Sequence, residues 1–354
     1  MSRFLHPRYA GLEAYTPGEQ PRDRQYIKLN TNESPYPPSP AVLAALPEQD
    51  LADLRLYSDP EGTVLRAKLG KLYGVDPGQV FLSNGSDDIL NFAFMAFGAD
   101  GAVFPALTYS FYPVFANLHG VAYETVPLRE DFTLDVTGMQ GKGKLTVFPN
   151  PNAPTGIALP LDQVEAIVAS NPDHVVVVDE AYVDFGADSA VPLLQKYENL
   201  LVVMTYSKSR SMAGARLGFA LGSRALIQDL EKLKYSTNPY NVNRLTLKLG
   251  QAAVDSDGYF REKAREIMAT REKTAQALRA LGFTLPDSQA NFLFVTHPKV
   301  AGETLYRKCK EKGVLIRHFS DPAIASYNRV TIGTPAEMEA FLAVVQTILK
   351  EEGA

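Results

Sequence analysis

Short apolar runs alternate with longer stretches of mixed character through most of the 354-residue chain. The runs are rich in β-branched residues and end in polar or turn-forming residues, which predicts strands. They read QVFLSNGS, GAVFPA, VAYETVPL, KLTVFPN, HVVVVDE and NLLVVMTYS. Stretches expected to be helical, such as LDQVEAIVAS and VPLLQKY, lie between several of them. Strands that alternate with helices predict βαβ units and a mainly parallel sheet.

The two ends of the chain differ from this pattern. Residues 1–40 are dense in proline and turn formers, which disfavour helix and predict an irregular arm. After about residue 245, a long charged stretch expected to be helical precedes two strand-like runs, ANFLFVTH and NRVTIGT, and a last helix. We therefore expect an N-terminal arm over residues 1–30 that packs with the small domain, a large domain over 31–245 and a small α+β domain over 246–354.

Composition narrows the function classes. Lys and Arg number 35 against 40 Asp and Glu, and the chain has no basic run, which argues against a nucleic-acid or membrane-surface partner. The single Cys309 excludes an intrachain disulfide and is expected to be a passive thiol on a helix. The N-terminal residues lack the apolar stretch of a secretory signal, and the most apolar segment, residues 89–99, is too short to cross a bilayer. We expect a soluble, cytoplasmic protein.

Two polar groups stand where apolar runs end. Asp179 directly follows four valines, and Thr205, Ser207 and Lys208 close the run NLLVVMTYS. Positions 179 and 208 are 29 residues apart, about the length of one βαβ crossover, so both groups are expected at the same edge of neighbouring strands. Ligands bind at that edge in open α/β sheets. Taken alone, the pair of Asp179 and Lys208 could also be an ion pair without chemistry.

The surroundings of Lys208 favour an anion site. Several hydroxyls flank it, and Arg216 follows eight residues later, which together suit a bound phosphate. A second cradle is expected at NGSDD, where Ser86 and Asp87 open a helix whose free N–H groups can hold a phosphate. An ordinary capped helix is the alternative interpretation of NGSDD.

The sequence lacks the motifs required for P-loop nucleotide binding, serine hydrolysis and metal binding. Residues 138–144 fit G-x-x-x-x-G-K, but Leu145 replaces the Ser or Thr that would hold magnesium, and a strand follows instead of a helix. The chain has no G-x-S-x-G, and its five histidines show no metal-ligand spacing, so no metal site is expected. A lysine amine, a carboxylate, a phosphate cradle and several tyrosines remain. These are the groups that a binding site for pyridoxal 5'-phosphate requires.

Motifs along nearly the whole chain resemble the fold-type-I pyridoxal-phosphate aminotransferases, and within them the histidinol-phosphate aminotransferases. They are AYTPGEQP, IKLNTNESPYPPSP, YSDPEG, SNGSDD, TYSFY, PNAPTG, VVVDEAYVDF, TYSKSRSMAGARLGF, SQANFLFV, GVLIRHF and NRVTIGT. The resemblance implies an α/β fold in which a large, cofactor-binding domain has a mainly parallel sheet sandwiched by helices, beside a smaller α+β domain. It also implies a homodimer.

The same resemblance implies roles for the cofactor site. Lys208 would hold the cofactor aldehyde as a Schiff base, and Asp179 would pair with the pyridine nitrogen. Tyr182 and Asn152 would hold the ring 3-oxygen, and Tyr109 would stack on the ring. The phosphate ligands would be Thr205, Ser207, Arg216, the backbone at Ser86 and Asp87, and Tyr57 from the partner subunit.

Substrate contacts follow from the resemblance as well. Arg329 would bind the α-carboxylate of one substrate and the phosphate of the other, and Tyr15, Asn32 and Arg317 would line the same pocket. A surface or interface ion pair is the alternative for each arginine.

The chain departs from the family pattern at two places. Many relatives read Asn-Pro-Thr-Gly where this chain has Ala153-Pro154-Thr155-Gly156, so the cofactor asparagine would be Asn152, with Asn150 as the alternative. Ser58 in YSDPEG stands where proline is frequent, which leaves Tyr57 intact in a less rigid turn.

The resemblance implies a specific reaction. It is an amino transfer between L-histidinol phosphate and 2-oxoglutarate that gives imidazole acetol phosphate and glutamate, as in histidine biosynthesis. An aromatic or broad-specificity aminotransferase and a threonine-phosphate decarboxylase-like enzyme are alternatives on the same scaffold. A cofactor-binding regulator and a simple α/β binding protein are alternatives from other classes. The arm is too short for the DNA-binding domain of such a regulator, and the binding protein would stay colourless with pyridoxal phosphate.

Overall fold

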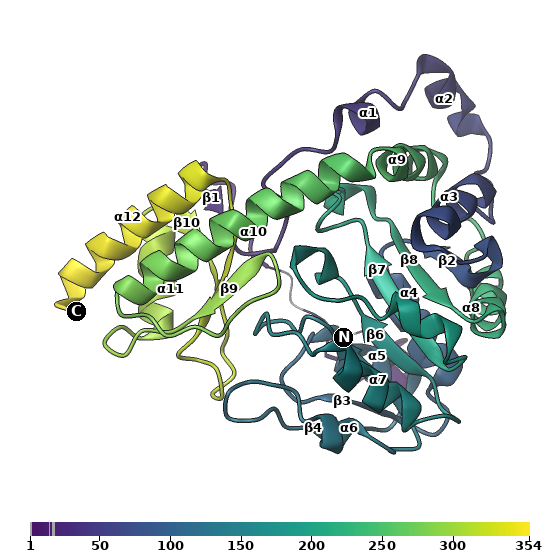
Figure 1. Ribbon diagram of the computed structural model, residues 1–354, viewed down its shortest axis with the longest axis horizontal. Helices are drawn as coiled ribbons and strands as arrows, with labels where there is room; N and C mark the ends of the chain where they lie inside the picture. Colours follow the sequence, from purple (N-terminus) through teal and green to yellow (C-terminus); the bar gives the residue numbers. More distant parts are fainter. Residues whose placement is uncertain (1, 14, 16–17) are drawn as a thin grey trace.

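The computed structural model describes residues 2–13, 15 and 18–354, which form a large and a small domain connected by one long helix (Figure 1). Of the motif AYTPGEQP, the positions 14, 16 and 17 lie outside the described residues. The long helix is α10, Asp257–Ala280, and the expected fold class is confirmed.

The large domain is built on a seven-stranded sheet with the order β2-β8-β7-β6-β5-β3-β4. Its strands are β2 (Val80–Ser83), β3 (Ala102–Pro105), β4 (Tyr123–Val126), β5 (Leu145–Pro149), β6 (Val176–Asp179), β7 (Leu200–Thr205) and β8 (Gly218–Gly222). Strands β4, β3, β5, β6 and β7 pair in parallel, and β8 runs antiparallel to β7 and β2. The apolar runs predicted all of these strands except β8, whose glycines do not have strand propensity.

Alternate residues of the central strands pack into two different cores. Val176 and Val178 of β6 belong to one hydrophobic cluster, whereas Val177 belongs to another. Helices therefore cover both faces of the sheet, as Figure 1 shows, and this explains why β6 is apolar at consecutive positions. The helices of this domain are α1 (Pro40–Leu43), α2 (Glu48–Ala52), α3 (Thr63–Tyr73), α4 (Ser86–Phe97), α5 (Phe111–His119), α6 (Val136–Met139), α7 (Leu161–Ala169), α8 (Arg224–Thr237) and α9 (Arg244–Asp255).

Short 3-10 helices fill several connections. They are η1 (Pro7–Tyr9), η2 (Asp53–Arg55), η3 (Pro77–Gln79), η4 (Val183–Phe185), η5 (Val191–Gln195) and η6 (Ala213–Ala215). The stretch VPLLQKY, expected to be helical, forms only the short 3-10 helix η5.

The small domain packs α10, α11 (Gly302–Glu311) and α12 (Pro335–Glu352) around a three-stranded antiparallel sheet, β11-β12-β9. The strands are β9 (Phe292–Val295), β10 (Val314–Leu315), β11 (Arg317–His318) and β12 (Asn328–Thr331). The N-terminal segment joins this domain, because β1 (Ile27–Lys28) pairs in parallel with β10. Cys309 is buried on α11, and burial raises the pKa of its thiol to about 12.

Helix α9 packs with the large domain. Leu247 and Val254 of α9 belong to the same hydrophobic cluster as Val176 of the central sheet, and Phe260 at the start of α10 joins them. Ile267, two turns further along α10, belongs to the small-domain cluster. On this packing we propose a domain division within α10, later than residue 245.

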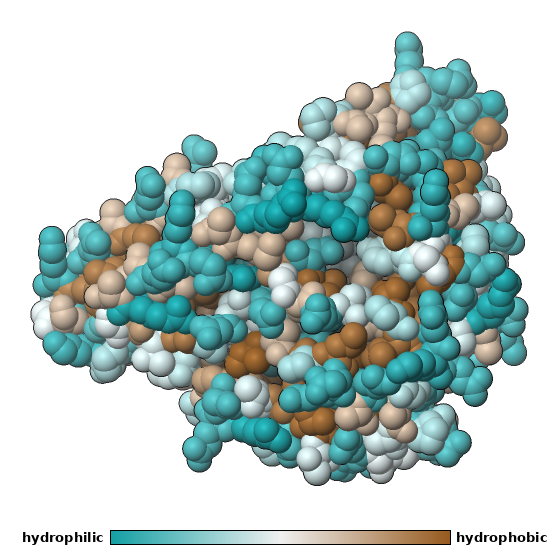
Figure 2. Space-filling view, in the orientation of Figure 1, coloured by the Kyte–Doolittle hydropathy of each residue, from teal (hydrophilic) through white to brown (hydrophobic). Residues whose placement is uncertain are grey.

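The surface drawn in Figure 2 is mostly hydrophilic, with hydrophobic residues exposed in small groups. None of the helices in the described part of the chain is long and apolar enough to span a membrane.

Candidate active site

The carboxyl ends of β6 and β7 meet at one edge of the sheet. Asp179 is in register with Val203 of the neighbouring parallel strand, and Lys208 follows that strand by three residues. The expected shared edge is therefore confirmed. A cavity of about 170 Å³ opens there, and we call it the inner cavity. Its wall includes most of the predicted cofactor residues, namely Ser86, Asp87, Tyr109, Asp179, Tyr182, Thr205, Ser207, Lys208 and Arg216.

Asp179 is a buried carboxyl group with two donors. Its Oδ2 accepts a hydrogen bond from the hydroxyl of Tyr112 at 3.0 Å, and its Oδ1 accepts one from the backbone N–H of Ala181 at 3.2 Å. Burial raises the pKa of Asp179 from 3.8 to about 6, although both hydrogen bonds lower it. Among the residues that the structure describes, no Lys, Arg or His side chain is hydrogen-bonded to this carboxylate. Its charge is therefore available to a bound group.

Lys208 points its amine toward the same cavity without a carboxylate partner among the described residues. Its Nζ donates only to the backbone carbonyl of Thr31, at 3.3 Å, and lies 5.7 Å from the ring centre of Tyr182. A lysine amine held by one long hydrogen bond keeps its freedom to react. The alternative of an Asp179–Lys208 ion pair is not observed in this structure.

A hydrogen-bonded chain fixes Tyr182 against the small domain. The Nδ2 of Asn32 donates to the Tyr182 hydroxyl at 3.0 Å, while its backbone N–H donates to Thr331 of β12 at 2.9 Å. The Nδ2 of Asn291 donates to the backbone carbonyl of Asn32 at 3.0 Å. Asn32 has a positive φ of 57° and is buried, so neighbours from both domains hold it in place.

The residues of the predicted phosphate cradle lie together at the inner cavity. Thr205 donates from Oγ1 to the Ser207 hydroxyl at 3.0 Å, and helix α4 begins at Ser86 beside them. Gly85 has a φ of 86°, and a Cβ there would lie 2.7 Å from NH2 of Arg216. Glycine at this position therefore lets the guanidinium lie against the start of α4, where the N–H groups point toward an anion.

A larger cavity of about 430 Å³, the outer cavity, adjoins the inner one, and Tyr109 and Ala153 line both. Tyr109 donates its hydroxyl to Asp87 at 2.8 Å, and burial together with this carboxylate raises its pKa. The predicted substrate residue Tyr15 also lines the outer cavity and stacks on Phe111, with ring centres 4.2 Å apart.

Two arginines face the outer cavity from neighbouring strands. Arg317 of β11 and Arg329 of β12 are directly opposite each other in the antiparallel register. NH2 of Arg329 donates to the Asn30 carbonyl at 3.2 Å, but its Nε is inaccessible to solvent and has no partner among the described residues. Burial, together with the charge of Arg317, lowers the pKa of Arg329. Two guanidinium groups that line the same cavity fit a bound oxyanion.

Three predicted residues do not contact these cavities as expected. Asn152 lines neither, because its amide is used inside its own loop, where it accepts from Thr108 and donates to the Leu107 carbonyl and to Thr155. The alternative Asn150 is also bound within the loop, to the backbone of Leu159.

The other two residues lie elsewhere for different reasons. Asn32 does not line the outer cavity, because its amide is used to hold Tyr182. Tyr57 is 77% exposed and stacks on Tyr240, away from the cavities of its own chain.

Sequence reasoning missed two residues that act on the site. Tyr112 donates to Asp179, and Thr31 accepts from Lys208. Both lie within motifs already singled out, TYSFY and IKLNTNESPYPPSP. Their contacts join segments 67 and 177 residues apart, and no local pattern encodes such contacts.

The chain is similar to known proteins over the length of both domains. A family model described as aminotransferase class I and II matches residues 24–345. The histidinol-phosphate aminotransferase of Brachyspira hyodysenteriae is 48% identical, over 99% of this chain and 100% of that protein. The protein of the same name from Marinomonas sp. is 48% identical over 98% of this chain and 100% of its own length.

A solved structure supports the same fold. The crystal structure of histidinol-phosphate aminotransferase from Sinorhizobium meliloti, in complex with pyridoxal-5'-phosphate, has a TM-score of 0.82 and 24% identity. The match covers 93% of this chain and 92% of that one.

The hydrogen bond from Tyr112 predicts how Asp179 titrates. Tyr112→Phe should raise the pKa of Asp179 above its value of about 6, because the bond favours the charged carboxylate. Since the folded pKa exceeds the ordinary 3.8, the contribution of Asp179 to stability falls between about pH 4 and pH 6, and Tyr112→Phe extends that fall to higher pH.

Carboxyl-carbon NMR of the cofactor-free protein measures this pKa directly. Tyr206→Phe is the matched control, because the Tyr206 hydroxyl is also buried but has no partner among the described residues. An unchanged pKa of Asp179 in Tyr112→Phe would contradict the assignment.

Proposed function

This chain belongs to the class I and II aminotransferase family, and on that premise we propose that it transfers an amino group between L-histidinol phosphate and 2-oxoglutarate, with pyridoxal 5'-phosphate as cofactor. The observation that carries the proposal is the pair of facing arginines, Arg317 and Arg329, in the outer cavity. This cavity adjoins the inner cavity, which is lined by the amine of Lys208 and by a buried carboxylate. Near full-length relatives named histidinol-phosphate aminotransferases support the choice of substrate.

The residues of the inner cavity fit pyridoxal 5'-phosphate. The buried carboxylate of Asp179 is hydrogen-bonded to no cationic side chain in the described part of the chain, so it suits a protonated ring nitrogen. Arg216 lies beside the N-terminus of α4, where the two could bind the phosphate. When bound, the cofactor supplies a ring that withdraws electrons from the substrate carbon. Asn152 is not proposed as a ligand, so Tyr182, oriented by Asn32, is the remaining partner for the ring oxygen.

Lys208 is the proposed catalytic acid and base. Its Nζ takes the proton from the Cα of the amino donor and later returns a proton, and the carbonyl of Thr31 keeps the amine oriented between these steps. Asp179 provides the negative charge that favours a protonated ring nitrogen throughout. The hydroxyl of Tyr109, whose pKa is raised, stays protonated and bound to Asp87.

One arginine pair can serve both substrates. L-Histidinol phosphate carries a phosphate and 2-oxoglutarate carries carboxylates, and both are oxyanions that accept paired hydrogen bonds from a guanidinium. The outer cavity also contains the aromatic residues Tyr15, Tyr123 and Phe319, which suit an imidazole ring and equally a benzene ring. This lining makes an aromatic amino-acid aminotransferase the second candidate.

Titration of the visible absorption band separates the two candidates. In the cofactor-loaded protein, L-histidinol phosphate should bleach the band at a much lower concentration than L-phenylalanine, because its doubly charged phosphate has three oxygens for the two arginines, whereas the carboxylate of L-phenylalanine has one charge and two oxygens. L-Glutamate serves as the second substrate. Lys208→Ala should lack the lysine-linked band and turnover, whereas the exposed Lys196→Ala should retain both. Stronger bleaching by L-phenylalanine would move the protein to the aromatic branch.

Arg329 should bind both substrates. Arg329→Leu should raise KM for L-histidinol phosphate and for 2-oxoglutarate by roughly ten- to a hundredfold, since a hydrogen bond to a charged group contributes about 1.5–3 kcal/mol. Steady-state kinetics measures both values. Arg279→Leu is the control, because Arg279 is bound to exposed Asp287 and does not line the outer cavity. An unchanged KM for both substrates would remove Arg329 from the site.

We also propose that the active protein is a homodimer. Tyr57 is exposed, but Arg244 holds its carbonyl at 2.8 Å, so the ring is positioned without contacting its own cavity. Three exposed leucines precede Tyr57 within six residues of the sequence, namely Leu51, Leu54 and Leu56. An apolar group of this kind fits a self-complementary interface through which Tyr57 reaches the phosphate site of a second copy. Cytoplasmic location stays a prediction from the sequence.

Subunit mixing tests the shared site. Lys208→Ala and Tyr57→Ala chains should each have low activity, whereas an equimolar mixture allowed to exchange should recover about a quarter of the wild-type sites, because one site in each mixed dimer is complete. Activity at limiting cofactor measures the recovery. Tyr235→Ala, which alters another exposed tyrosine, should be active without mixing. No recovery on mixing would place Tyr57 outside the partner's site.

A further inference from the structure

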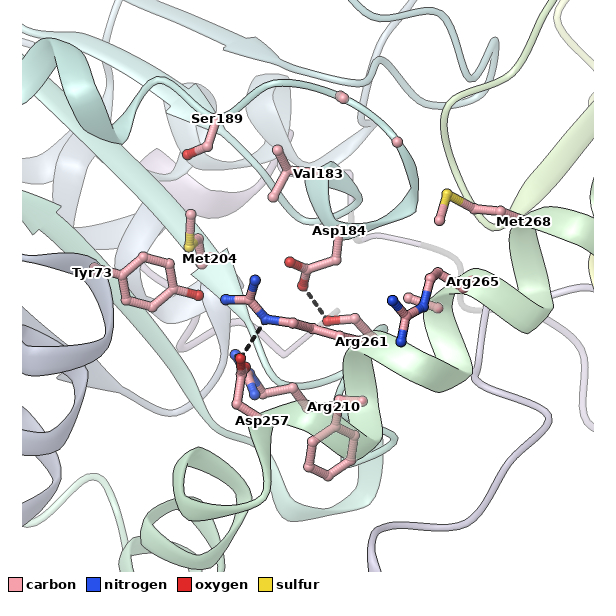
Figure 3. Close-up of a pocket in the computed structure, with 15 residues that line it drawn as sticks. Tyr73, Val183, Asp184, Ser189, Met204, Arg210, Asp257, Arg261, Arg265 and Met268 are labelled. Atoms are coloured by element: carbon pink, nitrogen blue, oxygen red, sulfur yellow. Dashed lines mark hydrogen bonds and ion pairs between the residues drawn. The ribbon is translucent and has the colours of Figure 1, made fainter.

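A separate cavity of about 340 Å³ lies beside the first turns of α10 (Figure 3). Its wall combines α10 with the segments that follow β6 and β7, including Asp184 and Arg210. No residue that lines it also lines the inner or the outer cavity. The proposed transamination uses none of its side chains.

Arginine predominates among the charged groups of this cavity. Arg210, Arg261 and Arg265 line it together with two carboxylates, Asp184 and Asp257. Asp257 accepts from NH2 of Arg210 at 2.7 Å and from Nε of Arg261 at 2.5 Å, and Figure 3 shows it between the two guanidinium groups. Both carboxylates are thus engaged, because Asp184 accepts from Ser209.

Donors of the arginines remain unused. Arg210 is only 5% exposed, yet its NH1 has no hydrogen-bond partner among the described residues. Arg265 has neither an ion pair nor a side-chain hydrogen bond in the described part of the chain, and its guanidinium lies at the cavity in Figure 3. NH1 of Arg210 is closed to solvent and would have to move to meet a ligand, whereas Arg265 is exposed and its guanidinium can donate to an anion in the cavity.

Several apolar side chains also form the wall, beside the hydroxyl groups of Tyr73, Ser189 and Ser209. Val183, Met204, Phe260, Ala264 and Met268 line the cavity opposite or between the arginines. Thioether side chains adapt to ligands of different shape. A cavity that combines guanidinium donors with several apolar side chains matches an anion that carries a hydrophobic body. We propose that this cavity binds a small organic carboxylate with an apolar body.

The site is next to the catalytic segments. Ser209 and Arg210 directly follow Lys208, and Val183 directly follows Tyr182. A carboxylate that draws Arg210 toward the cavity moves the residues bonded to Lys208. Occupation of this cavity is therefore coupled to the geometry of the catalytic lysine.

Benzoate is the test ligand, used on the cofactor-loaded protein with Arg329→Leu to weaken carboxylate binding in the outer cavity. Calorimetry should show benzoate binding to this variant, and adding Arg265→Ala should weaken it by roughly ten- to a hundredfold. Arg265 is on the exposed face of α10, so the change preserves the fold. Arg279→Ala, on the same helix but outside the cavity, should leave binding unchanged. Benzylamine, with the same ring and the opposite charge, should not bind.

The outcomes are distinct from those of the transamination tests. Benzoate should also shift the visible band of the lysine-linked cofactor in Arg329→Leu, and the shift should disappear when Arg265→Ala is added. Failure of benzoate to bind Arg329→Leu, or equal binding with and without Arg265, would overturn the site. Binding without a spectral shift would overturn the coupling to Lys208.

Discussion

The buried carboxylate of Asp179 is the constraint around which the large domain is arranged. A charged group at the end of a central strand is costly unless donors surround it, and here Tyr112 of α5 and the backbone of Ala181 provide them. Burial still raises the pKa to about 6, so the site retains electrostatic potential for a positive partner. The parallel pairing of β6 with β7 then brings Lys208 to the same edge, and the start of α4 completes the anion cradle.

The small domain contributes the selectivity of the proposed reaction. Its sheet brings Arg317 and Arg329 opposite each other, an arrangement of like charges that an oxyanion stabilises. The same strand β12 carries Thr331, which holds Asn32 and through it Tyr182. A substrate bound by the arginines is therefore mechanically connected to a residue of the cofactor cavity. This connection joins the two proposed roles, recognition of the anion and positioning of the ring.

Local rules succeeded where one segment carries the information and failed where contacts are long-range. The valine run of β6 predicted a doubly covered strand because each face of it packs into a core. Strand β8 was missed because its glycines are selected by close packing: a Cβ at Gly218 would lie 2.5 Å from the backbone of Gly85. The surroundings of Asn152 are also long-range, since its amide is bonded to Thr108 and Leu107 of another segment, and its expected role stays a prediction.

The sequence by itself determined the fold class, the cofactor chemistry and the residues at the strand ends, because hydrophobic period and motif spacing are local properties. Only the tertiary structure decided that Tyr112 protects Asp179, that Thr31 orients Lys208 and that two arginines face each other across β11 and β12. It also decided which arginine donors beside α10 have no partner among the described residues. These features depend on side chains brought together from distant segments, where burial and geometry set the energy of each polar group.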